Sequence, residues 1–341
     1  MRMDTQLSPR DQLLSLPPNG KGLLVYHWDT DGVTSAALLL NFLAQHKAGW
    51  QIDLLHPTIG NYFLLPAEYE RIRQGKYDLI MCVDLNFTLE TIEELEKTAP
   101  AVLVFDHHVQ TRDIQRPGKQ DVSFPGNSFL VNSALENPVN VTAILGMVGD
   151  QEERLKERED FFPFVELALQ GKGKSFDDVL RLTKLIDTNY ITLDSAGLER
   201  MIALVRKDPL FLLEDPVLLE KQKLIDETLN TAQTVTGVPV GKFGLEFNLE
   251  SPLHLLSEYT RALSRRFPDN IVMVTQMHPT YANIYLRRRN LPFDLSPFVD
   301  LARAQGCNAG GKVEVAGLII PLDKHPEFLK QVRHNLQAYG A

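Results

Sequence analysis

Three short apolar runs in the first third of the chain restrict its possible folds more than any other feature. They are "GLLVY" before His27, "YDLIMCV" before Asp84 and "AVLVF" before Asp106. Runs that are apolar at nearly every position suit strands covered on both faces, and helix-like stretches such as "SAALLLNFLAQH" separate them. This alternation of strand and helix predicts an α/β domain built on a parallel sheet.

Residue types that bind ligands follow each of these runs. Because the carboxyl ends of parallel strands line the crevice where ligands bind, we expect these residues to meet at one edge of the sheet. The segment "NVTAILGMVGDQE" predicts a helix that ends near Gly149 and brings a further acid to the same edge. The candidate residues are His27, Asp29, Asp31, Asp84, Asp106, His107, His108 and Asp150.

The first candidates alternate along the chain, so an extended strand end would point His27, Asp29 and Asp31 to one side. Carboxylates combined with imidazole favour Mn²⁺ or Mg²⁺ over a closed zinc site, which would prefer thiolates. The alternative is an Asp-rich turn in which Asp29 caps a helix that begins near Thr34. The adjacent histidines of "VFDHHVQ" favour the metal interpretation, because burying such a cluster without a metal or an anion is costly.

Composition sets wider limits. A chain of 341 residues is long enough for two domains, and 44% hydrophobic and 23% charged residues are typical of a folded globular protein. The first residues carry acids and prolines without an apolar stretch, no window is long enough for a membrane span, and Cys82 and Cys307 form no disulfide framework. We therefore expect a cytoplasmic protein with no membrane partner. The net charge of −9 does not exclude a polyanionic substrate, because bound cations neutralise acids at a metal centre.

The remaining sequence divides into two parts. Amphipathic helical patterns such as "SFDDVLRLTKLIDTNY" and "AGLERMIALVRK" predict a helical connector over residues 153–236. Strand-like segments such as "NIVMVTQM" and "VEVAGLIIP" then alternate with helix-like ones, which predicts a smaller α/β domain over residues 237–341. The catalytic domain is expected over residues 1–152.

The ordered segments "HWDTDG", "VDLN", "FDHH" and "GMVGD" resemble the four motifs of the DHH phosphoesterases over roughly residues 20–152. This superfamily includes RecJ-type single-strand exonucleases, nano-RNases, cyclic dinucleotide phosphodiesterases and family II pyrophosphatases. The resemblance implies two divalent ions, usually Mn²⁺ and otherwise Mg²⁺. It assigns His27 and Asp29 to one ion, Asp31, His107 and Asp150 to the other, and Asp84 to both. It also implies that Asp106 orients a neighbouring histidine and that His108 contacts the scissile phosphate.

The segment "LRRRNLPFDLSPFVDLARAQGCNAGGKVEVAGLIIP" resembles the domain that accompanies DHH catalytic units. That domain binds the remainder of a nucleic acid through an Arg on one strand and a Gly-Gly-His loop. We expect Arg287 and Arg289 to share a strand face, and the backbone N–H groups of Gly310 and Gly311 to cradle phosphate. Lys312 stands where the family has histidine, which keeps a cation but removes the imidazole.

The sequence thus predicts a metal-dependent phosphodiesterase, similar to the RecJ exonucleases, that acts on single-stranded nucleic acid or short oligonucleotides. Larger RecJ proteins carry an additional nucleic-acid-binding domain for which this chain has no room, so a phosphatase or phosphodiesterase of a small nucleotide is one alternative. A catalytically silent, nucleic-acid-associated scaffold is another, although all six candidate ligands are intact. A pyrophosphatase is disfavoured, since the Lys and Arg arrangement of its phosphate pocket is missing. No motif specifies DNA or RNA, the direction of degradation or the oligomeric state.

Overall fold

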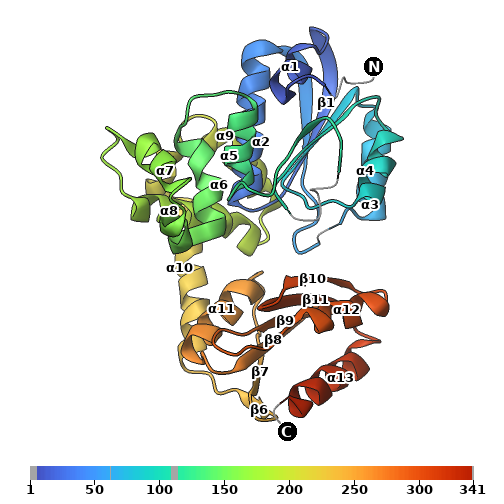
Figure 1. The fold of residues 1–341 in the computed structure, drawn as a ribbon, viewed down its shortest axis with the longest axis vertical. Helices are drawn as coiled ribbons and strands as arrows, with labels where there is room; N and C mark the ends of the chain where they lie inside the picture. The colour runs from blue at the N-terminus through green and yellow to red at the C-terminus, as the bar shows by residue number, and fades with distance from the viewer. Residues whose placement is uncertain (1–5, 62, 109–113, 340–341) are drawn as a thin grey trace. The chain divides into compact units, whose positions relative to one another are not determined.

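The computed structural model describes residues 6–61, 63–108 and 114–339. The chain forms two compact units, which comprise residues 1–222 and 223–341 (Figure 1). The helices of the predicted connector up to residue 215 belong to the first unit. Among the described helices, none is long and apolar enough to span a bilayer. Both cysteines are buried and free.

The first unit contains the predicted parallel sheet. Its strand order is β2-β1-β3-β4-β5, and every neighbouring pair is parallel. The three apolar runs form β1, β3 and β4, whereas β2 and β5 are edge strands that the apolar pattern does not reveal. The strands are β1 (Asn19–Tyr26), β2 (Gly49–Leu55), β3 (Leu79–Val83), β4 (Val102–Asp106) and β5 (Gly118–Gln120).

Helices cover both faces of this sheet, which explains why β3 and β4 are buried at every position (Figure 1). On one face, Val25, Ile80 and Val104 pack with Ile72 and Ile92 from the helices α3 and α4. The helices α2, α5 and α6 pack together, with α2 against β1 and β3 and α5 against β4. The bounds are α1 (Pro9–Leu14), α2 (Thr30–His46), α3 (Pro66–Gly75), α4 (Leu89–Glu96), α5 (Asn127–Ala134) and α6 (Val141–Gln151).

The predicted helical segment follows α6. The helix α8 packs against α6, and α9 packs against α2, so these helices extend the layer formed by α2, α5 and α6. The charged run after Asp150 forms the short 3₁₀ helix η2. The bounds are η2 (Glu152–Glu157), α7 (Phe162–Leu169), α8 (Phe176–Ile191), α9 (Ser195–Val205), η3 (Pro209–Glu214), α10 (Pro216–Asn230) and η4 (Thr231–Gln233).

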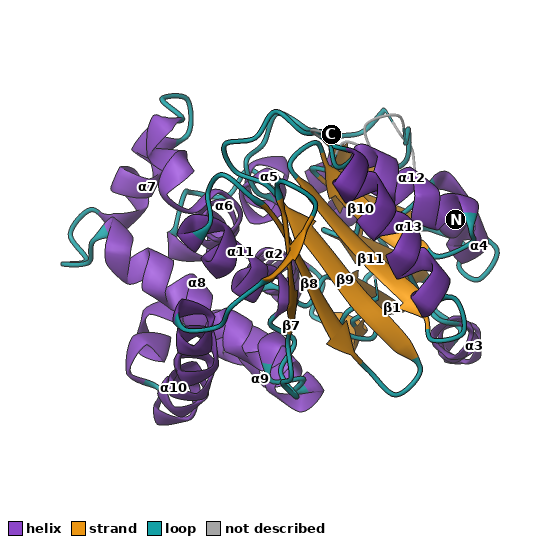
Figure 2. Cartoon of the chain, turned by 90° about the horizontal axis from the view of Figure 1, so that it is seen from below, coloured by secondary structure: helices purple, strands orange, loops and turns teal. Residues whose placement is uncertain are grey.

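The second unit is the predicted smaller α/β domain. Its sheet has the order β10-β11-β9-β8-β7-β6, with only the β7–β8 pair parallel among the described strands. Leu286 and Leu318 of this sheet pack with Phe298 of α12 and Phe328 of α13, and α11 packs on β8 and β9 (Figure 2). The bounds are β6 (Val238–Val240), β7 (Gly244–Asn248), α11 (Leu256–Arg266), β8 (Ile271–Met277), β9 (Tyr281–Arg287), α12 (Ser296–Ala304), β10 (Asn308–Lys312), β11 (Val315–Pro321) and α13 (His325–Ala338).

Candidate metal centre

The candidate residues meet at the carboxyl edge of the first sheet. The strand order reverses direction between β1 and β3, and such a switch point opens a crevice at the carboxyl ends of the two strands. His27 follows β1 and Asp84 follows β3, while Asp106 is the last residue of β4. Asp150 lies in the last turn of α6. The topology therefore delivers ligand-type side chains from four separate chain segments to one place.

His27, Asp29 and Asp84 form one group of donor atoms, all within 4.8 Å of one another. His27 Nδ1 lies 2.8 Å from Asp29 Oδ2 and 4.0 Å from Asp84 Oδ2. Burial opposes ionisation of Asp29, but the adjacent His27 outweighs it and lowers the pKa of this carboxyl to about 2. Asp29 is therefore a carboxylate over the whole physiological range.

The reason predicted for this grouping is wrong. His27, Asp29 and Asp31 do not alternate along an extended strand, because β1 ends at Tyr26 and α2 already begins at Thr30. Asp29 is the N-cap of α2, where its Oδ1 accepts a hydrogen bond of 3.0 Å from the Gly32 N–H. A sharp strand-to-helix turn therefore brings these side chains together, and the capping and ligand interpretations of Asp29 are compatible.

Asp31, His107 and Asp150 form a second group with donor atoms within 4.8 Å of one another. His107 Nε2 lies 3.3 Å from Asp150 Oδ2, 3.5 Å from Asp84 Oδ1 and 3.7 Å from Asp31 Oδ2. On the other side of the ring, Nδ1 lies 3.1 Å from the carbonyl oxygen of Phe124, which only accepts, so Nδ1 donates. This hydrogen bond fixes the imidazole with Nε2 directed at the carboxylates.

Asp31 is held by backbone groups that the sequence does not reveal. Its side chain is buried, and its two oxygens accept hydrogen bonds from the N–H groups of Asn127 and Ser128 at the start of α5 (2.5 and 2.6 Å). On the α6 side, a Cβ at Gly146 would lie 1.7 Å from Asp31 Oδ1. Gly146 leaves room for this carboxylate. In the sequence, only its place in the segment "GMVGD" marks this glycine as a residue of the site.

The packing of four carboxyl groups makes the site electrostatically unusual. Burial, followed by the charges of Asp31 and Asp29, raises the pKa of Asp84 well above its ordinary value. Burial and Asp31 raise the pKa of Asp150 to about 8. The backbone of Asp84 is also left-handed, with φ at 61°. The four carboxyl groups repel one another, and they lie together with His27 and His107. Carboxylate oxygens combined with imidazole nitrogens match the donor set of a divalent cation such as Mn²⁺ or Mg²⁺.

Asp106 has a different environment from the other acids. Its Oδ2 accepts hydrogen bonds from the N–H groups of Leu85 and Asn86, and its Oδ1 accepts from the backbone N–H and Nδ1 of His108. Burial opposes ionisation, but His108 outweighs it and lowers the pKa of Asp106 to about 2. The ionised carboxylate thus fixes the loop after β3 and orients the His108 ring, whose side chain is 37% exposed.

The substrate-binding residues predicted in the second unit only partly adopt the expected arrangement. Arg287 is the last residue of β9, and its Nε is buried without a hydrogen-bond partner in the described part of the chain. Its guanidinium lies 5.9 Å from the Tyr285 ring centre. The prediction that Arg289 shares a strand face with Arg287 is wrong, because the strand has ended and Arg289 is exposed in the following bend. Arg288 instead donates to the Phe293 carbonyl.

The two glycines do not lie in the predicted phosphate-cradling loop. Gly310 and Gly311 belong to β10 and pair with Gly317 and Ala316 of β11. A Cβ at Gly311 would lie 2.2 Å from the Val315 carbonyl oxygen, whereas a Cβ at Gly310 would meet open space. The fold therefore requires a glycine at position 311 but not at position 310. The side chain of Lys312 lies outside the described part of the structure.

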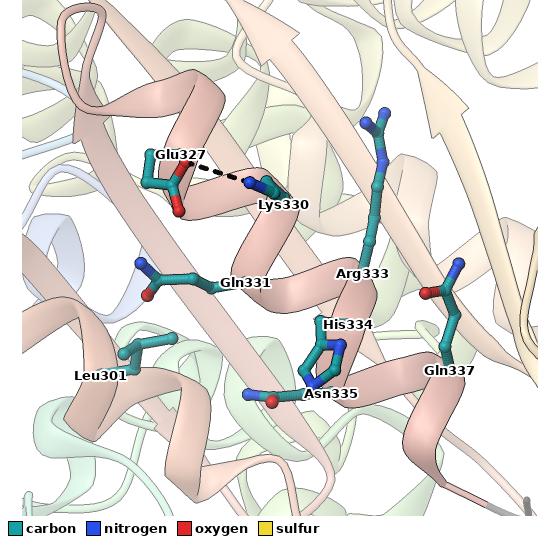
Figure 3. A pocket seen from close by; sticks show the side chains of 8 residues that line it. All are labelled: Leu301, Glu327, Lys330, Gln331, Arg333, His334, Asn335 and Gln337. Carbon is teal, nitrogen blue, oxygen red and sulfur yellow. Dashed lines mark ion pairs between the residues drawn. The ribbon is translucent and has the colours of Figure 1, made fainter.

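A separate groove of about 620 Å³ runs along α13 in the second unit (Figure 3). Its lysine and arginine are paired, Lys330 with Glu327 at 3.8 Å and Arg333 with Glu246 at 2.6 Å. The groove contains none of the residues singled out from the sequence. Its lining is formed by Leu301, Glu327, Lys330, Gln331, Arg333, His334, Asn335 and Gln337.

Comparison with known proteins gives a family and a fold. Residues 23–136 match the model of the DHH family, N-terminal domain. No curated protein sequence gives a significant match. Among solved structures, RecJ in complex with Mn²⁺ from Thermus thermophilus matches with a TM-score of 0.66 at 17% identity. That match covers 98% of this chain and 55% of RecJ, so the chain spans little more than half the length of that protein.

Two further structures have the same fold. An exonuclease RecJ bound to manganese matches with a TM-score of 0.62 at 16% identity, over 97% of this chain and 95% of the other. The pGpG-specific phosphodiesterase PggH from Vibrio cholerae matches with a TM-score of 0.50 at 15% identity, over 94% of this chain and 100% of the other. The fold of this chain is thus similar to the folds of manganese-bound RecJ structures and of a pGpG-specific phosphodiesterase.

Proposed function

The chain belongs to the DHH superfamily through the domain at residues 23–136, and we propose that it is a divalent-metal-dependent phosphodiesterase that hydrolyses single-stranded or short oligonucleotides. One observation carries the proposal. The six candidate ligands come from four chain segments and form two groups of three at the carboxyl edge of the sheet, and within each group the donor atoms lie within 4.8 Å of one another. Carboxylates that raise one another's pKa need a positive charge, and a catalytic metal centre is the simplest reason to keep them.

In this proposal the residues would hold two Mn²⁺ or Mg²⁺ ions. His27 and Asp29 would bind one ion, Asp31, His107 and Asp150 would bind the other, and Asp84 would be shared. Such ions supply Lewis-acid activation of water and of phosphoryl oxygens for an in-line displacement at phosphorus. The protein contributes their positions: the Phe124 carbonyl fixes the His107 tautomer and the α5 N–H groups fix Asp31.

His108 and Asp106 have a separate role in the proposed reaction. The Asp106 carboxylate accepts the Nδ1–H of His108, and we assign the contact with a phosphate oxygen to the other ring nitrogen, Nε2. When Nε2 carries a proton, it would donate a hydrogen bond to that oxygen and stabilise the negative charge that increases in the transition state. The Asp106 carboxylate, which stays ionised because, despite burial, His108 lowers its pKa to about 2, thus holds the His108 ring in this orientation.

We propose that the second unit binds another part of the same substrate. Support comes from Arg287, whose buried Nε has no hydrogen-bond partner within the described residues, and from Gly310, where open space lies above the strand. Arg287 is suited to a phosphate because a guanidinium donates two parallel hydrogen bonds. Arg289, two residues after Arg287, would add a further positive charge, which increases affinity without sequence preference, and the predicted role of Lys312 stays a proposal from the sequence.

A second candidate is a phosphodiesterase that acts on dinucleotides. It is supported by the match with PggH, a pGpG-specific phosphodiesterase, whose whole chain is covered. RecJ-like activity and dinucleotide hydrolysis use the same proposed metal centre, so they differ in the preferred substrate length and not in the chemistry.

The test is hydrolysis of end-labelled single strands, from dinucleotides to long oligonucleotides, with Mn²⁺ present. The exonuclease proposal predicts stepwise removal of mononucleotides with no loss of rate on longer strands, whereas the dinucleotide candidate predicts a rate that falls with length. Asp84→Asn is the control, because asparagine keeps the volume and tolerates the left-handed backbone at this position. Hydrolysis that survives this substitution, or that is unaffected by EDTA, would refute the metal mechanism.

A further inference from the structure

The loop that carries His27, Asp29 and Asp31 is attached to α8, a helix outside the matched residues 23–136. The attachment is through Thr30, which lies between the two acids and is 1% exposed. The backbone N–H of Thr30 donates to Asp187 Oδ1 at 2.8 Å, and its hydroxyl lies 2.7 Å from the same oxygen. The hydroxyl is also 2.9 Å from the Thr183 carbonyl, one turn earlier on α8.

A second contact attaches this loop to α8 through Trp28, the residue that precedes Asp29 in the chain. The Trp28 ring packs against the imidazole of His27, with 4.1 Å between ring centres and 34° between the planes. The Trp28 ring also packs against Tyr190 of α8, with 4.8 Å between ring centres. Trp28 and Tyr190 are 6% and 8% exposed, so these contacts are interior packing. The His27 imidazole is therefore supported through one aromatic ring by α8.

We propose that α8 positions the metal-binding loop, with Asp187 and Tyr190 as the positioning residues. Asp187 fixes the peptide between Asp29 and Thr30, and Tyr190, through Trp28, limits the rotation of the His27 ring. Neither side chain is a proposed ligand. The inference rests on the proposed metal centre, and it extends that centre to a helix from the predicted connector, where the sequence shows only amphipathic periodicity.

The physical reason concerns the geometry that a metal requires. Removing the Asp187 acceptor leaves a buried N–H of Thr30 unpaired, and the peptide rotates to find another partner. Rotation of this peptide moves Asp29, because the carboxylate is only one residue away. Partners that orient metal ligands typically change metal affinity by about 10- to 100-fold when they are removed. We expect a loss of this size for Asp187→Ala and a smaller loss for Asp187→Asn, which keeps an oxygen acceptor.

The experiment is titration calorimetry of the metal-free full chain with Mn²⁺, with folding checked by circular dichroism. The matched control is Asp178→Ala on the same helix. Asp178 hydrogen-bonds Ser175 in the cap at the other end of α8, so its loss weakens the helix without touching the loop. We expect Asp178→Ala to lower the melting temperature and leave Mn²⁺ affinity unchanged, while Asp187→Ala lowers the affinity.

The outcomes separate the two proposals. Wild-type protein that does not bind Mn²⁺ refutes the metal centre, and with it the inference. Wild-type binding combined with unchanged affinity in Asp187→Ala overturns the inference alone, as does an equal loss in Asp178→Ala. If Asp187→Ala does not fold, Tyr190→Leu and Tyr190→Phe decide, because only phenylalanine keeps the ring against Trp28. We then expect weakened Mn²⁺ binding in Tyr190→Leu and near-normal binding in Tyr190→Phe, and equal affinities would overturn the proposal.

Discussion

Replacing Asp150 by asparagine should stabilise the metal-free protein and weaken its binding of metal. Asp150 stands in a cluster of carboxyl groups, and burial together with Asp31 raises its pKa to about 8. Above this pH the folded, metal-free protein must hold an additional negative charge next to Asp31. An asparagine side chain at this position has nearly the same shape without the charge, so the repulsion disappears while the packing remains.

The size of the effect follows from the pKa shift. A rise from 3.8 to about 8 corresponds to roughly 6 kcal/mol at about 1.4 kcal/mol per pKa unit, if the group were fully shielded from water. The Asp150 side chain is 32% exposed, and solvent screens part of the repulsion. We therefore expect a gain of about 2–3 kcal/mol in the free energy of unfolding well above the pKa, or roughly 5–10 °C in melting temperature for a domain of this size.

The sign of the pH dependence is determined by the proton count. Between the unfolded and folded pKa values of Asp150, the folded state binds the additional proton, so the metal-free protein loses stability as the pH rises from about 4 to about 8. The pKa of His107 is raised too: burial opposes this, but Asp31 and Asp150 outweigh it. A histidine with a raised pKa also contributes stability that is lost as the pH rises. Both groups therefore make the stability of the metal-free protein fall as the pH rises.

The assay is thermal unfolding in EDTA near about pH 5 and about pH 8.5, followed by the same melts with Mn²⁺. We expect Asp150→Asn to exceed wild type by a small margin at the lower pH and by a much larger margin at the higher pH. With Mn²⁺ the order should reverse, because the variant lacks a ligand. Asp160→Asn, at an exposed carboxylate paired with Arg158, is the control and should show no gain at the higher pH. A variant that is less stable than wild type in EDTA at the higher pH would refute the electrostatic argument.

Three further predictions use substitutions that the structure separates clearly. Gly146→Ala should lower the free energy of unfolding by about 1–3 kcal/mol and weaken Mn²⁺ binding, because the new Cβ would meet Asp31. Gly149→Ala is the comparison: its Cβ would lie 3.6 Å from the nearest atom, so the substitution should raise the melting temperature. Thermal melts and titration calorimetry measure both effects. Gly311→Ala should destabilise the second unit, while Gly310→Ala should leave the melt unchanged and reduce oligonucleotide affinity in a filter-binding assay. Arg287→Gln should weaken that binding and reduce the salt dependence by about one counterion, and an unchanged salt slope would argue against a phosphate contact.

The sequence predicts the first sheet because its signal is local. The runs that form β1, β3 and β4 are apolar throughout, since helices cover both faces, and each run ends where the strand ends. The apolar pattern does not reveal the edge strand β2, because its burial alternates irregularly, as expected for a strand with one exposed side. In the second unit, Gly310 and Gly311 suggest a loop by composition, but their pairing with β11 decides the structure and depends on residues outside the segment.

The supporting contacts of the candidate metal centre are harder to predict than its candidate ligands. Asp84 and His107 can be recognised by residue type and by their place after apolar runs. The groups that orient the candidate ligands are backbone N–H and C=O groups, as at Ser128 and Phe124, or side chains more than a hundred positions away, as with Asp187 and Thr30. Backbone groups have no residue signature, and a single carboxylate on an amphipathic helix has the pattern of a solvent-facing residue.

At this site an acid can have a structural and a functional role at the same time. Asp29 caps α2, and Asp31 accepts hydrogen bonds from the start of α5, so both stabilise the fold while they face the proposed metal site. Substituting either residue removes a helix cap or a buried acceptor, and any loss of activity would then combine two causes. Asp84 and Asp150 cap none of the described helices, and they carry the raised pKa values. Neutralising these two acids therefore separates metal binding from folding, because the loss of the metal should coincide with a gain in metal-free stability.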